Sequence, residues 1–289
     1  MAGIAYMLAA MGVLASMDAA VKVLVTGGLP APQLIALRGW IIALVLLAWL
    51  PREGGFSALR AHRPVAMGLR ALVGAGAPIL FFQSLVTLGL AEATAITFSA
   101  TFIMAILSVP VLGERVGPHR WAAIGVGFLG VLIVTRPGTA AFQPAALLAL
   151  GAGAAYAALT LSTRWLGPTE STYRLVFWFN AGTALTMTAV LPLFWQPMTL
   201  AQLAGVAGVA GLSLVGHLLL TRAFIVAPVG VVGPIEYTAL VYAALFGFLL
   251  FGTVPDIWVV VGAAVIVSSG LYLVHRERRA AAEKWTMRK

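Results

Sequence analysis

The sequence predicts an all-α polytopic membrane protein with ten transmembrane helices, and two observations lead to that fold class. Apolar residues make up 61% of the 289 residues, whereas charged residues make up only 9%. A soluble domain of this length needs a charged surface, which eighteen bases and nine acids cannot cover. Several stretches also approach the ~20 apolar residues that cross a hydrocarbon core about 30 Å thick. We therefore expect the lipid bilayer to surround most of this chain.

Ten helices are predicted from the apolar runs that lie between Pro, Gly and charged residues. They cover residues 3–25, 33–50, 65–88, 92–112, 119–135, 144–164, 172–195, 199–226, 229–252 and 255–275. Very short links are expected between the third and fourth helices, around Leu90–Ala91, and between the eighth and ninth, around Ala227–Pro228. The first run is too long for a signal peptide and lacks a basic start, so we expect it to be a span.

The positions of Lys and Arg predict the orientation in the membrane. With the N-terminus in the cytoplasm, the outer loops hold only Arg136, and the inner loops and the tail hold most other bases. Ten spans with both termini inside agree with this bias, so we expect a multi-pass protein of the bacterial inner membrane. The basic residues 276–289 would form a cytoplasmic tail, either as an anchor at anionic lipid or as a partner-binding segment.

Several features recur about 137 residues apart and indicate an internal repeat. The motif W-x-x-x-G that opens the fifth helix at Trp121 recurs in the tenth helix at Trp258. Arg38 in the second helix is echoed by Arg174 in the seventh. The two short links also recur at a similar spacing.

Two halves of five helices each must cross the membrane in opposite directions, because five is odd. We therefore expect residues 1–137 and 138–275 to form two inverted five-helix repeats. Inverted repeats are typical of secondary transporters, in which the substrate site lies near the midplane between the halves.

The residues also resemble a known family. The segment Leu219–Arg278 closely resembles the C-terminal half of EamA-type transporters, which belong to the drug/metabolite transporter (DMT) superfamily. Ser84–Val116 is similar to that family's helix 3–4 region and ends in its Gly-Glu-Arg signature at Gly113–Arg115. Asp18, together with Lys22 and Arg38, falls where related sequences often carry such residues. The resemblance covers nearly the whole chain and implies a ten-helix fold and metabolite transport, often export.

One departure from the family lies in the second half. The chain reads Phe251-Gly252-Thr253 where the family usually has Phe-Gly-Glu. The resemblance therefore implies the family's fold, but not the complete set of residues that the family usually carries.

Polar side chains inside the spans are the candidates for substrate contact, because they need partners or water in lipid. The candidates are Asp18, Lys22, Gln83, Thr97, Thr101, Tyr156, Thr160, His217, Arg222, Glu236 and Tyr237. Steps of three and four place Thr97 with Thr101, and Tyr156 with Thr160, on single helical faces. The alternative for the threonines is contact between helices, and for His217 it is a bonded interior histidine rather than a proton relay.

Two predicted charge pairs leave a structural and a functional interpretation open. Asp18 and Lys22 are four residues apart, in the favourable order for a helical ion pair. They would either neutralise each other or line the outer mouth, where protonation of Asp18 would couple transport to a proton gradient. Arg222 and Glu236 would either form a pair that closes the inner side or contact substrate directly.

Three prolines inside predicted helices are candidate hinges, because each removes a backbone hydrogen bond and permits a bend. They are Pro78, Pro110 and Pro234. Prolines in transmembrane helices are also common where nothing moves.

These observations favour a secondary transporter that exports amino acids, aromatic or otherwise amphipathic, or similar small metabolites. Within the superfamily, the aromatic amino-acid exporters of the YddG type are the preferred comparison. Alternatives are uptake carriers for nucleoside-like or vitamin-like metabolites, exporters of cationic drugs, an intramembrane enzyme, and a scaffold or receptor subunit. We expect a monomer without cofactor or metal, since no Walker motif and no metal-ligand spacing occurs. We expect no nucleic-acid partner, since the bases lie between apolar runs rather than on one patch.

Overall fold

The computed structural model describes residues 2–113, 117–227 and 229–286, with the side chains at 112, 229, 230 and 276–286 left aside. Several predictions fall outside this part of the chain. They are the signature residues Glu114 and Arg115, Pro228 of the second short link, and the side chains of the basic tail.

The described residues form helices joined by loops and include ten helices long and apolar enough to cross a membrane, which confirms the predicted fold class. The first five spans are α1 (Ala2–Thr26), α2 (Ala31–Trp49), α3 (Pro64–Ser84), α4 with α5 (Leu90–Thr97 and Ala100–Leu112) and α6 (Pro118–Thr135). The last five are α7 (Ala145–Leu166), α8 (Thr172–Val190), α9 (Leu200–Val226), α10 to α11 (Val229–Val232, η4 at Gly233–Tyr237, and Thr238–Phe251) and α12 (Ile257–Thr286). Short 3₁₀ turns η1 (Leu50–Glu53), η2 (Gly55–Leu59) and η3 (Leu191–Leu193) follow α2 and α8.

The observed helix ends follow from local chemistry. Proline at the first or second position starts α2, α3 and α6, where its missing N–H is not needed. Thr199 and Gln202 form a reciprocal capping box at the start of α9. The third span ends at Ser84, four residues earlier than predicted, and Lys22 of α1 bonds the Leu85 and Leu88 carbonyls in the turn that follows.

The fourth and ninth spans are interrupted, which the sequence analysis did not predict for the fourth. In the fourth span, Phe98 and Ser99 separate α4 from α5, and the amide of Ser99 bonds the carbonyl three residues back, on Ile96. In the ninth span, η4 carries Pro234 and tightens the backbone in the same way before α11 begins. Short 3₁₀ stretches inside helices are typical of hinges.

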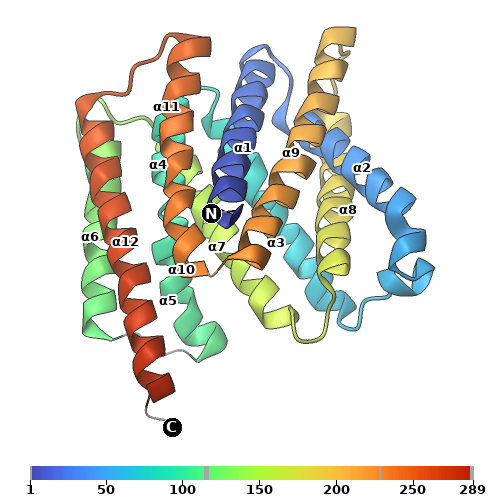
Figure 1. Ribbon diagram of the computed structural model, residues 1–289. Helices are drawn as coiled ribbons and strands as arrows, with labels where there is room; N and C mark the ends of the chain where they lie inside the picture. Colours follow the sequence, from blue (N-terminus) through green and yellow to red (C-terminus); the bar gives the residue numbers. More distant parts are fainter. Residues whose placement is uncertain (1, 114–116, 228, 287–289) are drawn as a thin grey trace.

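Figure 1 shows the helices as a bundle in which α6 and α12 lie side by side at one edge and α2 packs with α8 at the other. Between them, α1 packs on α9 and α7 packs on α3. If each of the first five spans is exchanged with its counterpart among the last five, the same pairs result. The pair of α1 and α9 becomes the pair of α7 and α3, and the other two pairs are exchanged within themselves. The pattern agrees with two five-span repeats, and the boundary at residues 137 and 138 stays a prediction.

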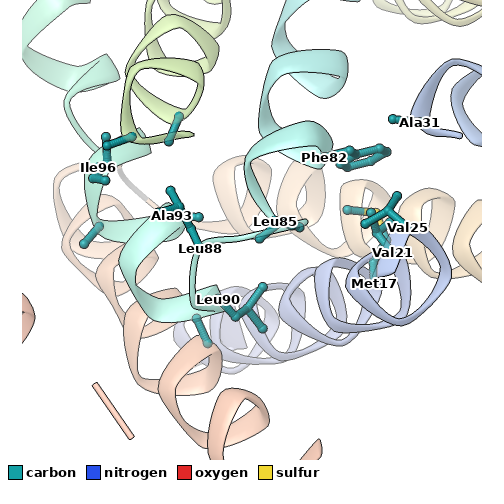
Figure 2. Packing of buried hydrophobic residues seen from close by; sticks show 14 of the residues in the cluster. Met17, Val21, Val25, Ala31, Phe82, Leu85, Leu88, Leu90, Ala93 and Ile96 are labelled. Atoms are coloured by element: carbon teal, nitrogen blue, oxygen red, sulfur yellow. The ribbon is translucent and has the colours of Figure 1, made fainter. Parts of the chain in front are cut away.

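The largest apolar core runs through the bundle, and part of it lies where α1, α2, α3 and α4 meet. Figure 2 shows Met17, Val21 and Val25 of α1 gathered near Phe82 of α3. The turn between α3 and α4 contributes its own leucines to this core, including the fully buried Leu88. The core therefore fixes α1 against the α3–α4 turn.

The repeated motifs do not have equivalent surroundings. Gly130 and Gly262 allow α6 and α12 to approach closely, whereas Gly125 of the first W-x-x-x-G motif faces open space. Arg38 is the eighth residue of α2, but Arg174 is the third residue of α8. The two arginines therefore recur in the sequence but do not occupy equivalent positions in the structure.

Candidate functional site

Arg38 is the centre of the first group of functional side chains. It is buried within the bundle, with 7% of its surface exposed, and its Nε has no hydrogen-bond partner among the described residues. Its guanidinium lies 5.6 Å from the ring centroid of Phe82 on α3. Its charge interacts with that of Asp18 on α1 and with His217 on α9. We call these four residues the Arg38 cluster.

His217 joins the Arg38 cluster in a defined orientation. Its Nδ1 lies 2.7 Å from the carbonyl oxygen of Ser213, one turn back on α9. A neutral histidine that donates this bond keeps an acceptor lone pair on Nε2. The bond to Ser213 therefore fixes the orientation of the imidazole relative to α9.

Lys22 has partners other than the predicted one. Its Nζ donates to the carbonyl oxygens of Leu85, at 3.1 Å, and of Leu88 in the α3–α4 turn, and it lies 5.3 Å from the ring centroid of Phe251. Among the described residues it forms no ion pair with Asp18. The predicted pair of Asp18 and Lys22 is wrong, because the turn's free carbonyls hold the ammonium group and Arg38 takes its place beside Asp18.

A second group surrounds the two helix interruptions. The rings of Phe98 and Tyr237 lie 4.9 Å apart between centroids, so the break in the fourth span touches the break in the ninth. Tyr237 also lies against Thr101, and Tyr156 of α7 lies against Thr160. Glu236 on η4 is near both tyrosines. We call Phe98, Thr101, Tyr156, Glu236 and Tyr237 the Tyr237 cluster.

Two glycines allow the Tyr237 cluster to form. A side chain at Gly270 of α12 would place its Cβ 1.7 Å from the Tyr237 hydroxyl, so only glycine leaves room for that group. A Cβ at Gly153 of α7 would meet the Ser99 hydroxyl at 2.9 Å and the Thr97 carbonyl at 3.1 Å, directly at the break between α4 and α5. The close approach of these helices therefore depends on the two glycines.

Glu236 and Arg222 do not form the predicted pair. Within the described part of the chain, neither side chain makes an ion pair, and Arg222 is exposed whereas Glu236 is half-buried. The pairing fails because α9 directs Arg222 outward. Glu236 thus stays a candidate for direct contact with a ligand.

The remaining candidates are only partly brought together. Gln83 is exposed, next to the buried Phe82. The Thr97 hydroxyl donates to the Ala93 carbonyl one turn back, at 2.8 Å, as expected for a hydroxyl that satisfies its own helix. Among the proline candidates, Pro78 and Pro110 lie inside uninterrupted parts of α3 and α5. The third, Pro234, lies in an interruption.

A cavity of about 250 Å³ lies between α4 and the loop that precedes α12. Glu92, Arg136, Gln143 and Asp256 contribute its polar wall. Arg136 Nη2 and Asp256 Oδ2 form an ion pair of 2.8 Å, and the charges of Glu92 and Lys22 interact. Lys22 therefore connects this cavity to α1, one helical turn from Asp18.

The opposite ends of the helices carry a charge network that holds loops together. The carboxylate of Glu170 accepts hydrogen bonds from Arg174 Nη1 at 2.7 Å and from the backbone amides of His62 and Arg63 at 2.8 Å each. Arg174 Nε donates to the Ala58 carbonyl at 2.9 Å. Burial acts to raise the pKa of Glu170, but these hydrogen bonds outweigh it and hold the pKa below its ordinary value. We call this network the Glu170 clamp.

Comparison with known proteins shows what kind of protein this is. Residues 1–136 match the sequence profile of the EamA-like transporter family. The chain carries an EamA-like transporter domain. The ten spans of the described residues and the relatives below, which are all named as transporters, agree with a membrane transporter.

The relatives are transporters with different named cargoes. The pseudopaline exporter of Pseudomonas aeruginosa is 28% identical over 244 residues, 83% of this chain and 84% of that protein. A riboflavin transporter of Rhizobium johnstonii is 29% identical over 249 residues, covering 83% and 80%. An S-adenosylmethionine uptake transporter of Rickettsia prowazekii is 27% identical over 254 residues, covering 86% and 84%. One of these names denotes export and another uptake, so they do not fix a direction of transport for this chain.

A solved crystal structure supports the fold of the whole chain. It superimposes with a TM-score of 0.64 at 21% identity and covers 96% of this chain and 97% of its own. At this identity the likeness concerns the arrangement of the helices alone.

Proposed function

We propose that this EamA-type transporter is a secondary active exporter of amino acids or similar small amphipathic metabolites, working by alternating access. The cargo passes the Arg38 cluster and the Tyr237 cluster between two inverted halves. The relatives carry three different named cargoes at nearly equal identity, so the cargo class is argued from the side chains.

The buried state of Arg38 carries the proposal. A guanidinium is always charged, and a charge inside a membrane span is costly unless it has a partner or a ligand. Arg38 has a nearby acid in Asp18, yet its Nε has no hydrogen-bond partner within the described residues. A planar fork of N–H donors fits a carboxylate, the group that all amino acids share.

The Tyr237 cluster supplies the complementary features. Glu236 offers a half-buried carboxylate with no ion pair among the described residues, which suits an ammonium group. The rings of Tyr237, Phe98 and Tyr156 offer apolar faces beside it. Mostly apolar walls with a few charged groups are typical of sites for amphipathic small molecules.

Alternating access is supported by the two interrupted spans. Breaks in corresponding spans of two halves are the usual position of a transporter site, and here the breaks contact each other through Phe98 and Tyr237. Both termini would lie in the cytoplasm, which puts the Arg136 cavity on the outer side and the Glu170 clamp on the inner side. Because the two halves enclose the pathway, one copy of the chain suffices.

Counterflow in proteoliposomes tests the proposal. Purified protein is loaded with unlabelled amino acids, and uptake of the same labelled amino acid is measured against protein-free vesicles. We expect accelerated exchange for at least one amino acid, with aromatic ones first. Exchange of riboflavin or S-adenosylmethionine without any amino acid would refute the cargo class, and no exchange of any solute would refute the transporter mechanism.

Variants of the Arg38 cluster connect the activity to the site. Arg38→Gln should reduce exchange at least about tenfold, as expected when a buried charged hydrogen bond to a ligand is lost. Arg52→Gln is the matched control, because Arg52 lies over the Trp49 ring on the exposed η1. Asp18→Asn tests proton coupling. If export and its pH dependence are unchanged in that variant, Asp18 has no role in coupling.

Two alternatives predict different results. An uptake carrier or a drug exporter of the same superfamily would exchange vitamin-like solutes or organic cations in the same vesicles. An intramembrane enzyme would form product from solute in detergent, where no transport occurs.

A further inference from the structure

A groove lies on the outer surface of the bundle between α3 and α7, at the end nearest the Glu170 clamp. Its volume is about 610 Å³. The floor and walls are apolar and include Val65, Leu69, Val73 and Leu159. The first three are 76%, 58% and 47% exposed and follow one another at steps of four, so they form one face of α3. Since α3 is a membrane span, this exposed apolar face meets lipid.

Two arginines border this apolar groove. Arg63 lies at the start of α3, and its guanidinium is 5.4 Å from the ring centroid of Trp165 on α7. Arg70 lies two turns further along α3 and donates from Nη1 to the Leu175 carbonyl and from Nη2 to the Thr163 hydroxyl, both at 3.0 Å. Neither guanidinium forms an ion pair with an acid among the described residues.

The two arginines keep charge and hydrogen-bond donors for a ligand. The two hydrogen bonds of Arg70 use two of the five N–H groups of its guanidinium, and a third, on Nε, is buried. The carboxylate of Glu170, whose partners include the Arg63 backbone amide, is occupied by Arg174 and by backbone amides. The rim of the groove therefore carries two positive charges that form no ion pair with any acid in the described part of the chain.

We propose that this groove, bordered by Arg63 and Arg70, is a binding site for one anionic phospholipid. The acyl chains lie along Leu69 and Val73, and the phosphate binds the two arginines beside Trp165. Arginine pairs with phosphate through parallel N–H donors, and basic pockets between spans are suited to anionic headgroups. Tryptophan is enriched at the level of the lipid headgroups, because its ring is apolar and its N–H can bond water.

The headgroup, not the tails, makes the site selective. Lipid tails are as apolar as the groove, so tail contacts give no preference over the surrounding bilayer. The backbone amides of His62 and Arg63 both donate to the Glu170 carboxylate. The Glu170 clamp therefore fixes the backbone at the rim of the groove. A preformed pair of charges at the edge of an apolar groove selects an anionic lipid over a zwitterionic one.

The test uses delipidated protein in a neutral detergent. Phosphatidylglycerol and phosphatidylcholine with identical tails are titrated, and binding is followed by native mass spectrometry and by the unfolding temperature. We expect phosphatidylglycerol to bind and to stabilise the protein, and phosphatidylcholine to do neither at the same concentration. The double variant Arg63→Gln, Arg70→Gln should weaken phosphatidylglycerol binding by about tenfold or more.

Further variants separate lost binding from lost folding. Leu69→Trp fills the groove without changing a charge and should also weaken binding. Arg52→Gln removes a base outside the groove and should leave binding unchanged. The proposal is overturned if both lipids bind equally, if the arginine and Leu69 variants bind as the wild type does, or if soluble glycerol phosphate stabilises the protein as strongly as the lipid.

Discussion

Arg38 and Arg174 are both buried arginines, but their surroundings give them different roles. Arg174 bonds Glu170 and the Ala58 carbonyl and thereby holds two loops together. Arg38 lies over the Phe82 ring, and its charge interacts with that of Asp18. Its Nε forms no hydrogen bond within the described residues. Breaking a satisfied buried pair destabilises the fold, whereas an unsatisfied buried cation is available to a ligand. The first arginine is therefore the better candidate for substrate contact.

Gly270→Ala is expected to disturb the Tyr237 cluster. The added Cβ would lie 1.7 Å from the Tyr237 hydroxyl, so the ring must leave its place against Phe98. Inserting a methyl group into a packed interior costs about 1–3 kcal/mol. We expect counterflow activity to fall by roughly tenfold.

Gly125→Ala is the matched control, because a Cβ at Gly125 meets open space and should change little. Tyr237→Phe removes the clashing hydroxyl. The double variant Tyr237→Phe, Gly270→Ala should therefore lose less activity than the sum of the two single changes. Strict additivity would show that Gly270 does not act through Tyr237.

The candidate residues could be chosen from the sequence, but their partners could not. Intramembrane polarity singled out Asp18, Glu236 and Tyr237, and all three lie in the two clusters. The partner of Lys22 is a pair of backbone carbonyls in a turn more than sixty residues away, and a carbonyl leaves no mark in a sequence. Likewise, spacing along α1 suggested an ion pair that Arg38 of another helix displaced.

At the scale of the elements, the two interrupted spans are the main departure from a plain ten-helix bundle. Pro234 in η4 marks one interruption, and the sequence indicates this proline as a candidate hinge. The other interruption, at Phe98 and Ser99, contains no proline. It accompanies the close approach of Gly153 on α7 to the Ser99 hydroxyl, which is a tertiary contact. Hydropathy and helix breakers therefore predict the spans but only one of the two breaks.

Pro234→Ala is expected to favour a continuous ninth span, because it restores the N–H that proline lacks. The unfolding temperature should rise or stay unchanged, while counterflow should slow by roughly tenfold. Pro110→Ala is the comparison, since Pro110 lies in an uninterrupted part of α5. An equal loss of activity in both variants would show that η4 has no special part in the motion.

The Glu170 clamp predicts a pH-dependent stability. The pKa of Glu170 is lower in the folded chain than in the unfolded chain, so its stabilisation is present above the ordinary value of 4.5 and is lost as the pH falls through the lower folded value. Glu170→Gln leaves the buried Arg174 without its partner and should lower the unfolding temperature by roughly 5 °C at neutral pH.

That difference between Glu170→Gln and the wild type should shrink once the pH falls below the folded pKa, because the wild type then loses the same charge. Unfolding in detergent between neutral and acidic pH measures it. Glu53→Gln, an exposed acid on η1, should match the wild type throughout. A difference that is constant with pH would mean that Glu170 stabilises the fold by packing rather than by charge.

At the scale of the whole molecule, the two ends of the bundle are chemically different. One end carries the Arg136 cavity with its mixture of acids and a base, and the other carries the Glu170 clamp and the arginines beside the α3–α7 groove. Anionic lipid on the cytoplasmic side attracts bases, so the arginine-rich end is expected to face inward. The orientation, the export direction and the lipid site all depend on this asymmetry.

Labelling of single introduced cysteines can determine the orientation in the membrane. The chain has no cysteine of its own, so no other thiol of the protein reacts with the label. Ser57 lies on η2 at the arginine-rich end, and Ala140 lies in the loop after α6 at the opposite end, and both are exposed. In spheroplasts, a membrane-impermeant maleimide should label Ala140→Cys at once and Ser57→Cys only after the membrane is opened. The reverse pattern would place the Glu170 clamp outside, because Ser57 lies at the same end of the bundle as the clamp. In that case the Arg136 cavity becomes the cytoplasmic entrance, and the arginine-rich end becomes the exit.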